Sequence, residues 1–129
     1  MSKENVGVVK QLFLALETDD FATALQLFDA EVEWSPTEGT YHGIEGVGTS
    51  FIEWMEPWDE HRIEPEEFVE ADDRVLVTVH LTARGQGSGM EIDQRFFQVY
   101  TVHDGKIRRM VEYVDRARAL EATGLPDQP

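Results

Sequence analysis

The segment Glu91–Asp115, EIDQRFFQVYTVHDGKIRRMVEYVD, constrains the possible folds of this chain most strongly. It holds two runs rich in Val, Ile, Phe and Tyr, and between them lies Asp104–Gly105, a dipeptide that favours a two-residue β-turn. The segment therefore predicts two long antiparallel strands. Three polar residues interrupt the apolar pattern, namely Gln98, Arg108 and Glu112, and each could lie either in solvent or in a pocket.

Two more strands are expected before this hairpin, in the segments 61–71 (HRIEPEEFVEA) and 73–85 (DRVLVTVHLTARG). Turn-forming residues separate the segments, at Asp72–Asp73 and at 85–89 (GQGSG). Together the four strands predict an antiparallel meander. In the second segment one strand face is wholly apolar, whereas the other is mixed and carries His80 at its centre.

Helical patterns occupy the N-terminal part of the chain. Between Ser2 and Thr18 apolar residues recur at helical spacing, with Ser2 as a candidate N-cap. The pair Asp19–Asp20 is expected to cap a short second helix whose apolar positions run to Phe28. The two predicted helices form a hairpin.

Two further helices are predicted. The first covers 44–55 and ends before Pro57, because proline cannot continue a helix. The second covers 116–123, with Asp115 as its N-cap and Gly124 as its stop.

Helices first and strands afterwards are typical of the α+β class. The predicted architecture is a cone-shaped, curved antiparallel sheet wrapped around a helical hairpin plus a third helix, with a short extra strand at Val32–Trp34. A length of 129 residues fits one domain, so residues 1–129 are predicted to form a single unit. Because a twisted sheet around helices leaves an open mouth, a hydrophobic pocket between them is expected.

Composition excludes several classes of function. A formal charge of −15 repels phosphate backbones and anionic membrane surfaces, so neither nucleic acid nor a membrane is an expected partner. The chain has no cysteine, and its four histidines lack ligand spacing, so no metal and no cofactor are expected. No apolar run approaches the roughly 18 residues of a membrane span, and no export signal is evident, which favours a cytoplasmic location.

Several motifs together resemble one known superfamily. They are VEW at 32–34, YHGIEG at 41–46, and DGKI with EYVDRARALEATGL near the end of the chain. Their order is similar to that of the nuclear transport factor 2-like superfamily, and more narrowly of its SnoaL-like polyketide cyclase branch, from about Val6 to Leu125. The resemblance implies a cystatin-like α+β roll, a scaffold that hosts isomerases, cyclases, epoxide hydrolases, dehydratases and binding proteins alike.

Two enzyme types within this resemblance lack their residues here. The ketosteroid isomerase positions fall on Trp34, Phe13 and Gln98, so the base and the tyrosine are missing. The Asp-Arg-Asp relay of the epoxide hydrolases would fall on Glu112 and around His80, so this relay is not intact.

Aldol-type cyclases of the SnoaL-like branch match better. They use a carboxylate on the last strand and a histidine 14 residues earlier, and those positions are Glu112 and Gln98 here. The resemblance thus implies Glu112 as acid or base and Gln98 as oxyanion donor, and we add His80 as an auxiliary residue. The alternatives are that His80 is a hydrogen-bonded structural residue and that Glu112 pairs with an arginine on a solvated face (Arg95, Arg108 or Arg109).

Aromatic residues supply candidate walls for the pocket, because flat apolar rings favour a hydrophobic ligand. The candidates are Phe13, Trp34, Tyr41, Trp54, Trp58 and Phe97. Plain core packing is the alternative for all of them, and it suits Trp54 at its helical spacing, whereas Trp34 and Tyr41 are expected at the pocket rim.

Three functions remain open from the sequence. The first is a cofactor-independent enzyme acting on a small hydrophobic carbonyl compound. The second is a non-catalytic module that binds a hydrophobic molecule, and the third is a dimeric interaction protein. A homodimer through the sheet is expected in each case, because an uncovered face with Val, Phe and Tyr needs a partner.

Overall fold

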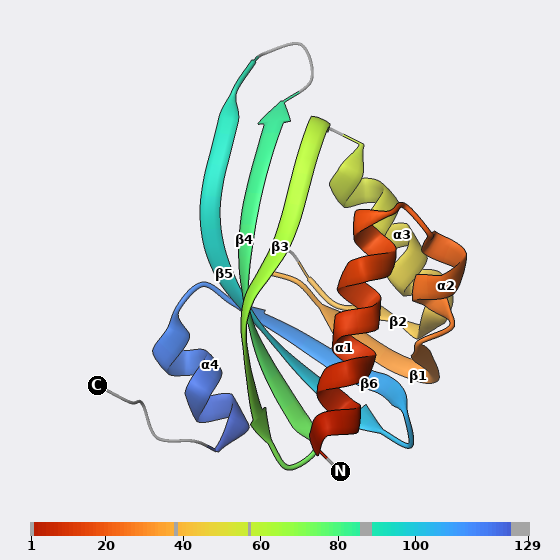
Figure 1. Ribbon diagram of the computed structural model, residues 1–129. Coiled ribbons are helices and arrows are strands. Elements are labelled where there is room, and N and C mark those ends of the chain that lie inside the picture. Colours follow the sequence, from red (N-terminus) through yellow and green to blue (C-terminus); the bar gives the residue numbers. More distant parts are fainter. Residues whose placement is uncertain (1, 38, 57, 86–88, 125–129) are drawn as a thin grey trace.

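The computed structural model describes residues 2–37, 39–56, 58–85 and 89–124, and it has the predicted α+β architecture (Figure 1). Three helices and two strands come first in the chain, and four strands and a last helix follow. Their bounds are α1 Ser2–Glu17, α2 Phe21–Leu25, β1 Phe28–Ser35, β2 Tyr41–His42, α3 Gly43–Met55, β3 Trp58–Ala71, β4 Arg74–Gly85, β5 Glu91–His103, β6 Lys106–Tyr113 and α4 Arg116–Thr123.

The strands form one six-stranded sheet in the order β2-β1-β6-β5-β4-β3. The predicted meander is confirmed as β3 to β6, in which every neighbouring pair is antiparallel. β1 extends the sheet beyond the prediction, because it pairs with β6 in parallel, and β2 then pairs with β1 in the antiparallel sense. The sheet is therefore mixed at this edge.

Two-residue turns connect β3 to β4 and β5 to β6 where the sequence predicted turns. His103 pairs with Lys106, so Asp104 and Gly105 alone form the turn, with φ angles of 52° and 75°. Positive φ at both central residues is the geometry of a type I′ turn, which asparagine, aspartate and glycine tolerate best.

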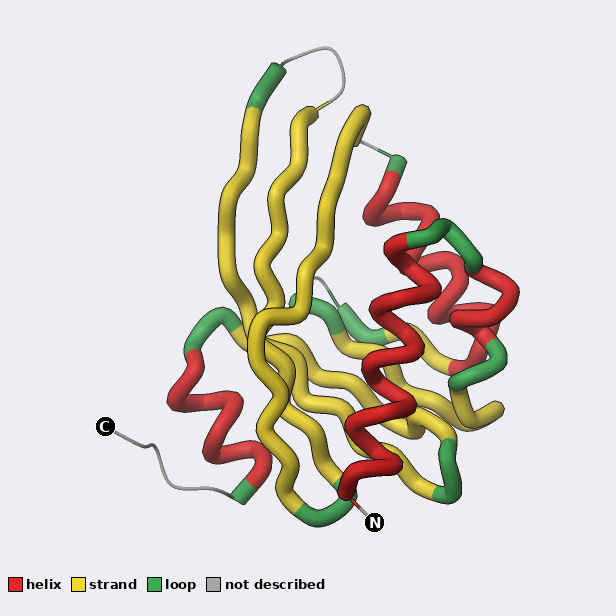
Figure 2. Tube along the Cα trace, in the orientation of Figure 1, coloured by secondary structure: helices red, strands yellow, loops and turns green. Residues whose placement is uncertain are grey.

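Helices lie on both sides of the sheet (Figures 1 and 2). α1, α2 and α3 cover one side, which we call the inner face, and α4 lies against the other side, the outer face. The main core is between the inner face and the helices, and its fully buried members include Leu12, Val77, Tyr100 and Met110.

α4 covers an apolar part of the outer face. Leu120 and Ala119 pack there against Leu76 of β4 and Val99 of β5, together with the half-buried rings of Phe97 and Tyr113. A homodimer was expected because apolar residues on the outer face would otherwise be exposed to solvent. α4 already shields Val99, Phe97 and Tyr113 from solvent. The homodimer stays a prediction.

Local signals placed most helix ends correctly. The Asp20 side chain accepts a hydrogen bond from the Thr23 amide, and Asp115 accepts one from Ala117, so both N-caps are confirmed. Gly124 ends α4 with a φ of 82°. The expectation that Phe28 belongs to the second helix was wrong: this residue begins β1, because its backbone joins the parallel pairing with β6. The predicted roles of the Ser2 side chain and of Pro57 lie outside what the structure describes.

Among the residues that the structure describes, no helix has both the length and the apolar character that crossing a membrane requires.

The packing of α4 yields a test of stability. Leu120 is 3% exposed, so Leu120→Ala is expected to lower the free energy of unfolding by about 2–4 kcal/mol through loss of burial and creation of a cavity. Leu14 of α1 is 62% exposed, so Leu14→Ala is a matched control that should change this free energy by less than about 0.5 kcal/mol. Urea unfolding of both variants measures the difference, and equal effects would contradict the docking of α4.

Candidate functional site

A small cavity lies between the inner face of the sheet and helices α1 and α3. Its volume is about 70 Å³. Its walls are mainly aromatic and come from all these elements: Phe13, Trp34, Phe51, Trp54, Phe96 and Tyr100. Three polar side chains also border it, and they are Ser50 of α3, Gln98 of β5 and Glu112 of β6. An apolar hollow with few polar groups is the usual form of a ligand site.

Strand register brings the two key polar residues together. Gln98 is directly opposite Glu112 in the antiparallel β5–β6 pair, so both side chains point to the same face of the sheet. Tyr100 is two residues from Gln98 on β5, and it shares that face because side chains alternate along a strand.

An irregularity in β6 determines this register. Near the turn Val102 pairs with Ile107, but Thr101 pairs with Arg109, so Arg108 is an extra residue in β6. Without this β-bulge, counting from the turn would place Val111 opposite Gln98, and Glu112 would point to the outer face. The Arg108 side chain itself is exposed, so of the two alternatives left open by the sequence it lies in solvent.

A chain of hydrogen bonds joins the polar residues of the cavity. The Tyr100 hydroxyl donates to Gln98 Oε1 at 2.5 Å, and Gln98 Nε2 donates to Glu112 Oε1 at 3.0 Å. The other carboxylate oxygen, Oε2, accepts from the backbone N–H of Thr37 at 3.3 Å. Both oxygens of Glu112 therefore act as acceptors, which is the behaviour of an ionised carboxylate.

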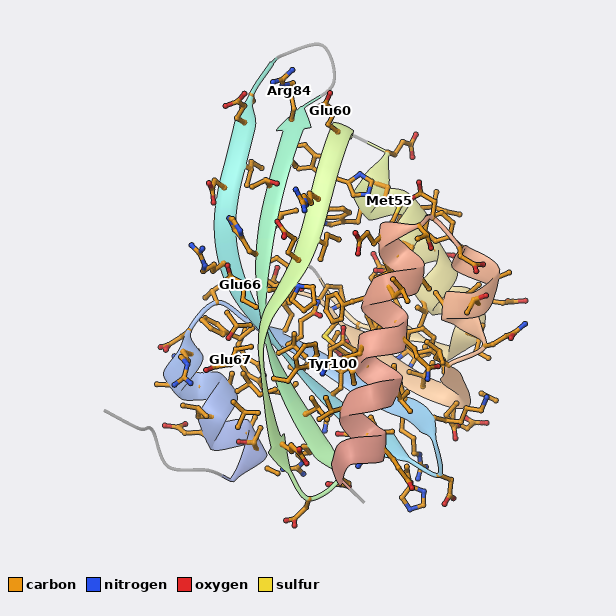
Figure 3. The ribbon with its side chains drawn as sticks, in the orientation of Figure 1. Met55, Glu60, Glu66, Glu67, Arg84 and Tyr100 are labelled. Atoms are coloured by element: carbon orange, nitrogen blue, oxygen red, sulfur yellow. The ribbon has the colours of Figure 1, made fainter. Side chains whose placement is uncertain are left out.

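The burial of Tyr100 determines which group donates and which accepts in each of these hydrogen bonds. Tyr100 is 1% exposed, and Figure 3 shows it between α1 and the sheet. Burial raises the pKa of its hydroxyl well above 10, and the negative charge of Glu112 raises it further. The hydroxyl thus stays protonated and must donate, so the carbonyl of Gln98 faces Tyr100 and its NH₂ group faces Glu112. One hydrogen of that NH₂ group is used by Glu112, and the amide has a second.

The structure agrees with only part of the predicted wall. Phe13, Trp34 and Trp54 line the cavity, although Trp34 is a buried core residue and not a rim residue, at 5% exposure. Tyr41 instead donates from its hydroxyl to Glu53 Oε1 at 2.8 Å. Trp58 packs on Trp54, with ring centroids 6.3 Å apart, and does not border the cavity.

The prediction for Phe97 was wrong by one residue. Phe97 lies on the outer face against α4, and its neighbour Phe96 lines the cavity. Alternation along β5 requires this result, because the residue that shares a face with Gln98 is two positions away from it.

His80 does not join the site. It lies on the outer face of β4, where its Nε2 is 2.6 Å from Asp93 Oδ1 and its Nδ1 is 3.7 Å from Glu66 Oε2. Arg95 donates to Glu66 at 2.7 Å, which holds the pKa of this carboxyl below its usual value. His80 therefore belongs to a network of charged side chains on the outer face and cannot assist Glu112 directly.

Two of the three arginines that could have paired with Glu112 contact other carboxylates, and the third, Arg108, has an exposed side chain. Arg95 contacts Glu66, and Arg109 Nε lies 3.7 Å from Glu33 Oε2. Glu112 and Gln98 both border the cavity.

Sequence reasoning missed Tyr100, which orients the amide of Gln98. A signal was present, because a tyrosine two residues from Gln98 must share its face in a strand. Within the described ranges, no group of three or more His, Cys, Asp or Glu side chains is arranged to hold a metal ion.

Comparisons with known proteins bear on the family and the fold of the chain. The model of the family described as "SnoaL-like domain" matches residues 9–110. No curated protein sequence matches the chain.

Solved structures share the fold along almost the whole chain. TerC, co-crystallised with polyporic acid, is 23% identical with a TM-score of 0.78, and the match covers 94% of this chain and 98% of TerC. A nuclear transport factor 2-like protein from Burkholderia xenovorans LB400 is 27% identical with a TM-score of 0.73, over 95% of this chain and 98% of that one. A protein assigned as a SnoaL-like polyketide cyclase, from Jannaschia sp. CCS1, is 19% identical with a TM-score of 0.79, over 98% of this chain and 95% of that one.

The raised pKa of Tyr100 yields a test of the hydrogen-bond chain. Tyr100→Phe leaves the Gln98 carbonyl without its donor, so at neutral pH it is expected to lower the free energy of unfolding by about 1–3 kcal/mol. A pKa that is higher in the folded state stabilises the protein fully below the unfolded value of about 10, and this stabilisation is lost as pH rises through the folded value.

The difference between wild type and Tyr100→Phe should therefore shrink above pH 10, by about 1.4 kcal/mol per pH unit. Urea unfolding of both proteins between pH 7 and pH 11 measures it. Curves that stay parallel across this range would show that Tyr100 is not held as a buried, neutral donor.

Proposed function

Because the chain belongs to the SnoaL-like domain family, we propose that it is a cofactor-independent acid–base enzyme of the cyclase or isomerase type, acting on a small hydrophobic carbonyl compound. The observation that carries this proposal is the contact between Glu112 and Gln98 at an aromatic cavity. A carboxylate, the proposed base, thus lies next to a neutral amide donor, in a hollow whose other walls are mainly aromatic.

The proposed step is the transfer of a proton from carbon. The C–H bond next to the substrate carbonyl breaks, its proton goes to Glu112, and its electron pair forms an enolate. The negative charge then develops on the carbonyl oxygen, where the second hydrogen of the Gln98 amide stabilises it. Return of the proton from Glu112 to another carbon completes an isomerisation. In a cyclisation the enolate carbon attacks a second carbonyl instead, and Glu112 returns its proton to the alkoxide that forms.

The geometry suits both contacts at once. The Gln98 nitrogen and the Glu112 oxygen are 3.0 Å apart, and in a ketone the carbonyl oxygen and the neighbouring carbon are separated by two bonds. One group can therefore contact the oxygen while the other contacts the proton on carbon. Tyr100 is a positioning residue in this scheme, because it holds the Gln98 carbonyl and so aims the NH₂ group toward Glu112 and the cavity.

A binding module without catalysis is the second candidate. It is favoured by the fact that both oxygens of Glu112 already accept hydrogen bonds, which stabilise the carboxylate in place. The experiments below separate the two functions, because one measures binding and the other measures proton transfer.

Loss of the base is the first test. Acetophenone and 1-indanone are suitable probes, and NMR in D₂O follows exchange of the protons next to their carbonyl. Glu112→Gln keeps the shape of the side chain but removes the base, so the exchange rate is expected to fall by about 10²–10⁴-fold. The matched control is Glu121→Gln on α4, an exposed site on the other side of the sheet, which should exchange at the wild-type rate.

Binding of the same ketones is followed through the fluorescence of Trp34 and Trp54, both of which line the cavity. Exchange that survives Glu112→Gln would overturn the assignment of the base. Binding without exchange in the wild type would contradict catalysis and indicate the binding module, and absence of both would contradict the whole proposal.

Loss of the oxyanion donor is the second test. Gln98→Leu removes the amide, so kcat for exchange is expected to fall by about 10²-fold while the Kd for acetophenone changes little, because charge develops on the oxygen only in the transition state. Gln94→Leu, at an exposed position of the same strand, is the control and should leave kcat unchanged. A rise in Kd with unchanged kcat would assign Gln98 to binding alone.

A further inference from the structure

A second hollow adjoins the cavity and is more polar. It lies between the last turn of α1 and the first half of β3, with a volume of about 250 Å³. We call it the side groove. Leu16, Met55 and Ile63 border both the cavity and the side groove, so these three apolar side chains form the wall between the two.

Met55 is the part of this wall that can move most easily. Its unbranched side chain has three rotatable bonds, and it belongs to the last turn of α3, beside the upper end of α1 (Figure 3). A third hollow on its other side, between α2 and α3, is bordered by Met55 together with Phe21, Leu25 and Ile52. Met55 therefore has space into which its side chain can turn, and such a turn would open the wall between the cavity and the side groove.

The side groove has an excess of negative charge. Glu17, Asp19 and Glu64 border it, against one arginine, Arg62, and one histidine, His61. Arg62 Nε lies 3.2 Å from Glu64 Oε1, so these two charges compensate each other. Within the described part of the chain, Glu17 and Asp19 form no ion pair, and their charges remain to attract a cation.

From these observations we propose that the ligand has two ends of different chemistry. A flat apolar end with the carbonyl occupies the cavity, and a chain of a few atoms passes Met55 and ends in an amine, which lies in the side groove near Glu17 and Asp19. This inference rests on the proposed function for its carbonyl end, and it adds a length and a charge to the substrate class.

Three compounds with an acetophenone head test the inference. They carry at the para position a 3-aminopropyl, a butyl or a 2-carboxyethyl tail, and acetophenone itself has no tail. The aminopropyl compound is expected to bind about five-fold more tightly than the butyl compound of equal length, since exposed charge pairs are individually weak. The advantage should shrink at high salt, and the carboxyethyl compound should bind more weakly than the butyl compound.

Variants locate the two parts of the site. Glu17→Gln combined with Asp19→Asn should abolish the aminopropyl advantage and leave acetophenone binding unchanged, whereas the remote pair Asp73→Asn with Glu121→Gln should preserve the advantage. Met55→Ala removes the movable part of the wall, so the aminopropyl and butyl compounds should each gain about ten-fold in affinity relative to acetophenone. This is the gain expected if the open form of the wild-type site is populated at about one tenth.

The failures are distinguishable. If acetophenone binds and undergoes exchange that depends on Glu112, but the aminopropyl tail gives no advantage or keeps it in the Glu17/Asp19 double variant, the inference is wrong and the proposed function stands. If acetophenone neither binds nor exchanges, the proposed function falls first. Unchanged relative affinities in Met55→Ala would overturn the role of Met55 as the movable wall.

Discussion

The single extra residue in β6 is the constraint on which the candidate site depends. Arg108 interrupts the regular pairing of β5 with β6, and every pair beyond it is shifted by one position. Because side chains alternate, this shift decides that Met110 and Glu112 point to the inner face while Val111 and Tyr113 do not. A bulge close to the turn thus selects the residue that enters the cavity, several positions further along the strand.

Because Glu112 faces inward, neighbouring residues have to supply hydrogen-bond donors for its carboxylate. A carboxylate at the wall of an aromatic hollow is costly unless hydrogen bonds compensate for the water it loses. Gln98 provides one donor and the backbone of Thr37 provides another, and Tyr100 in turn satisfies the carbonyl of Gln98. The direction of each bond follows from the one before it, because a buried phenol that keeps its proton can only donate into this chain.

The sequence predicted well whatever local signals determine. Turns at Asp72 and Asp104, caps at Asp20 and Asp115, and alternation in β4 each depend on a few consecutive residues, and the structure confirms them. The pairing of β1 with β6 was not predicted, because it brings Trp34 beside Met110 across most of the chain and leaves no local pattern.

The site was predicted less evenly, and for a physical reason. Glu112 and Gln98 were selected together through a resemblance, and their adjacency depends on a bulge that residue counting from the turn does not reveal. Phe97 was chosen where Phe96 lines the cavity, an error of one position that changes the face of the sheet. His80 was selected for its chemistry alone, and its strand face places it among charges on the far side.

In this fold, the elements that carry the polar residues of the site differ from those that set the size of its hollows. The polar chain belongs to β5 and β6, whose positions are fixed by long ladders of backbone hydrogen bonds, whereas the wall of the side groove belongs to α1, α3 and the start of β3. Side chains on helices can change without disturbing the strand register that aligns Glu112 with Gln98. A scaffold built in this way can alter the size and charge of its hollows while it keeps one arrangement of carboxylate and amide. This separation is one physical reason why a shared fold specifies so little about a substrate.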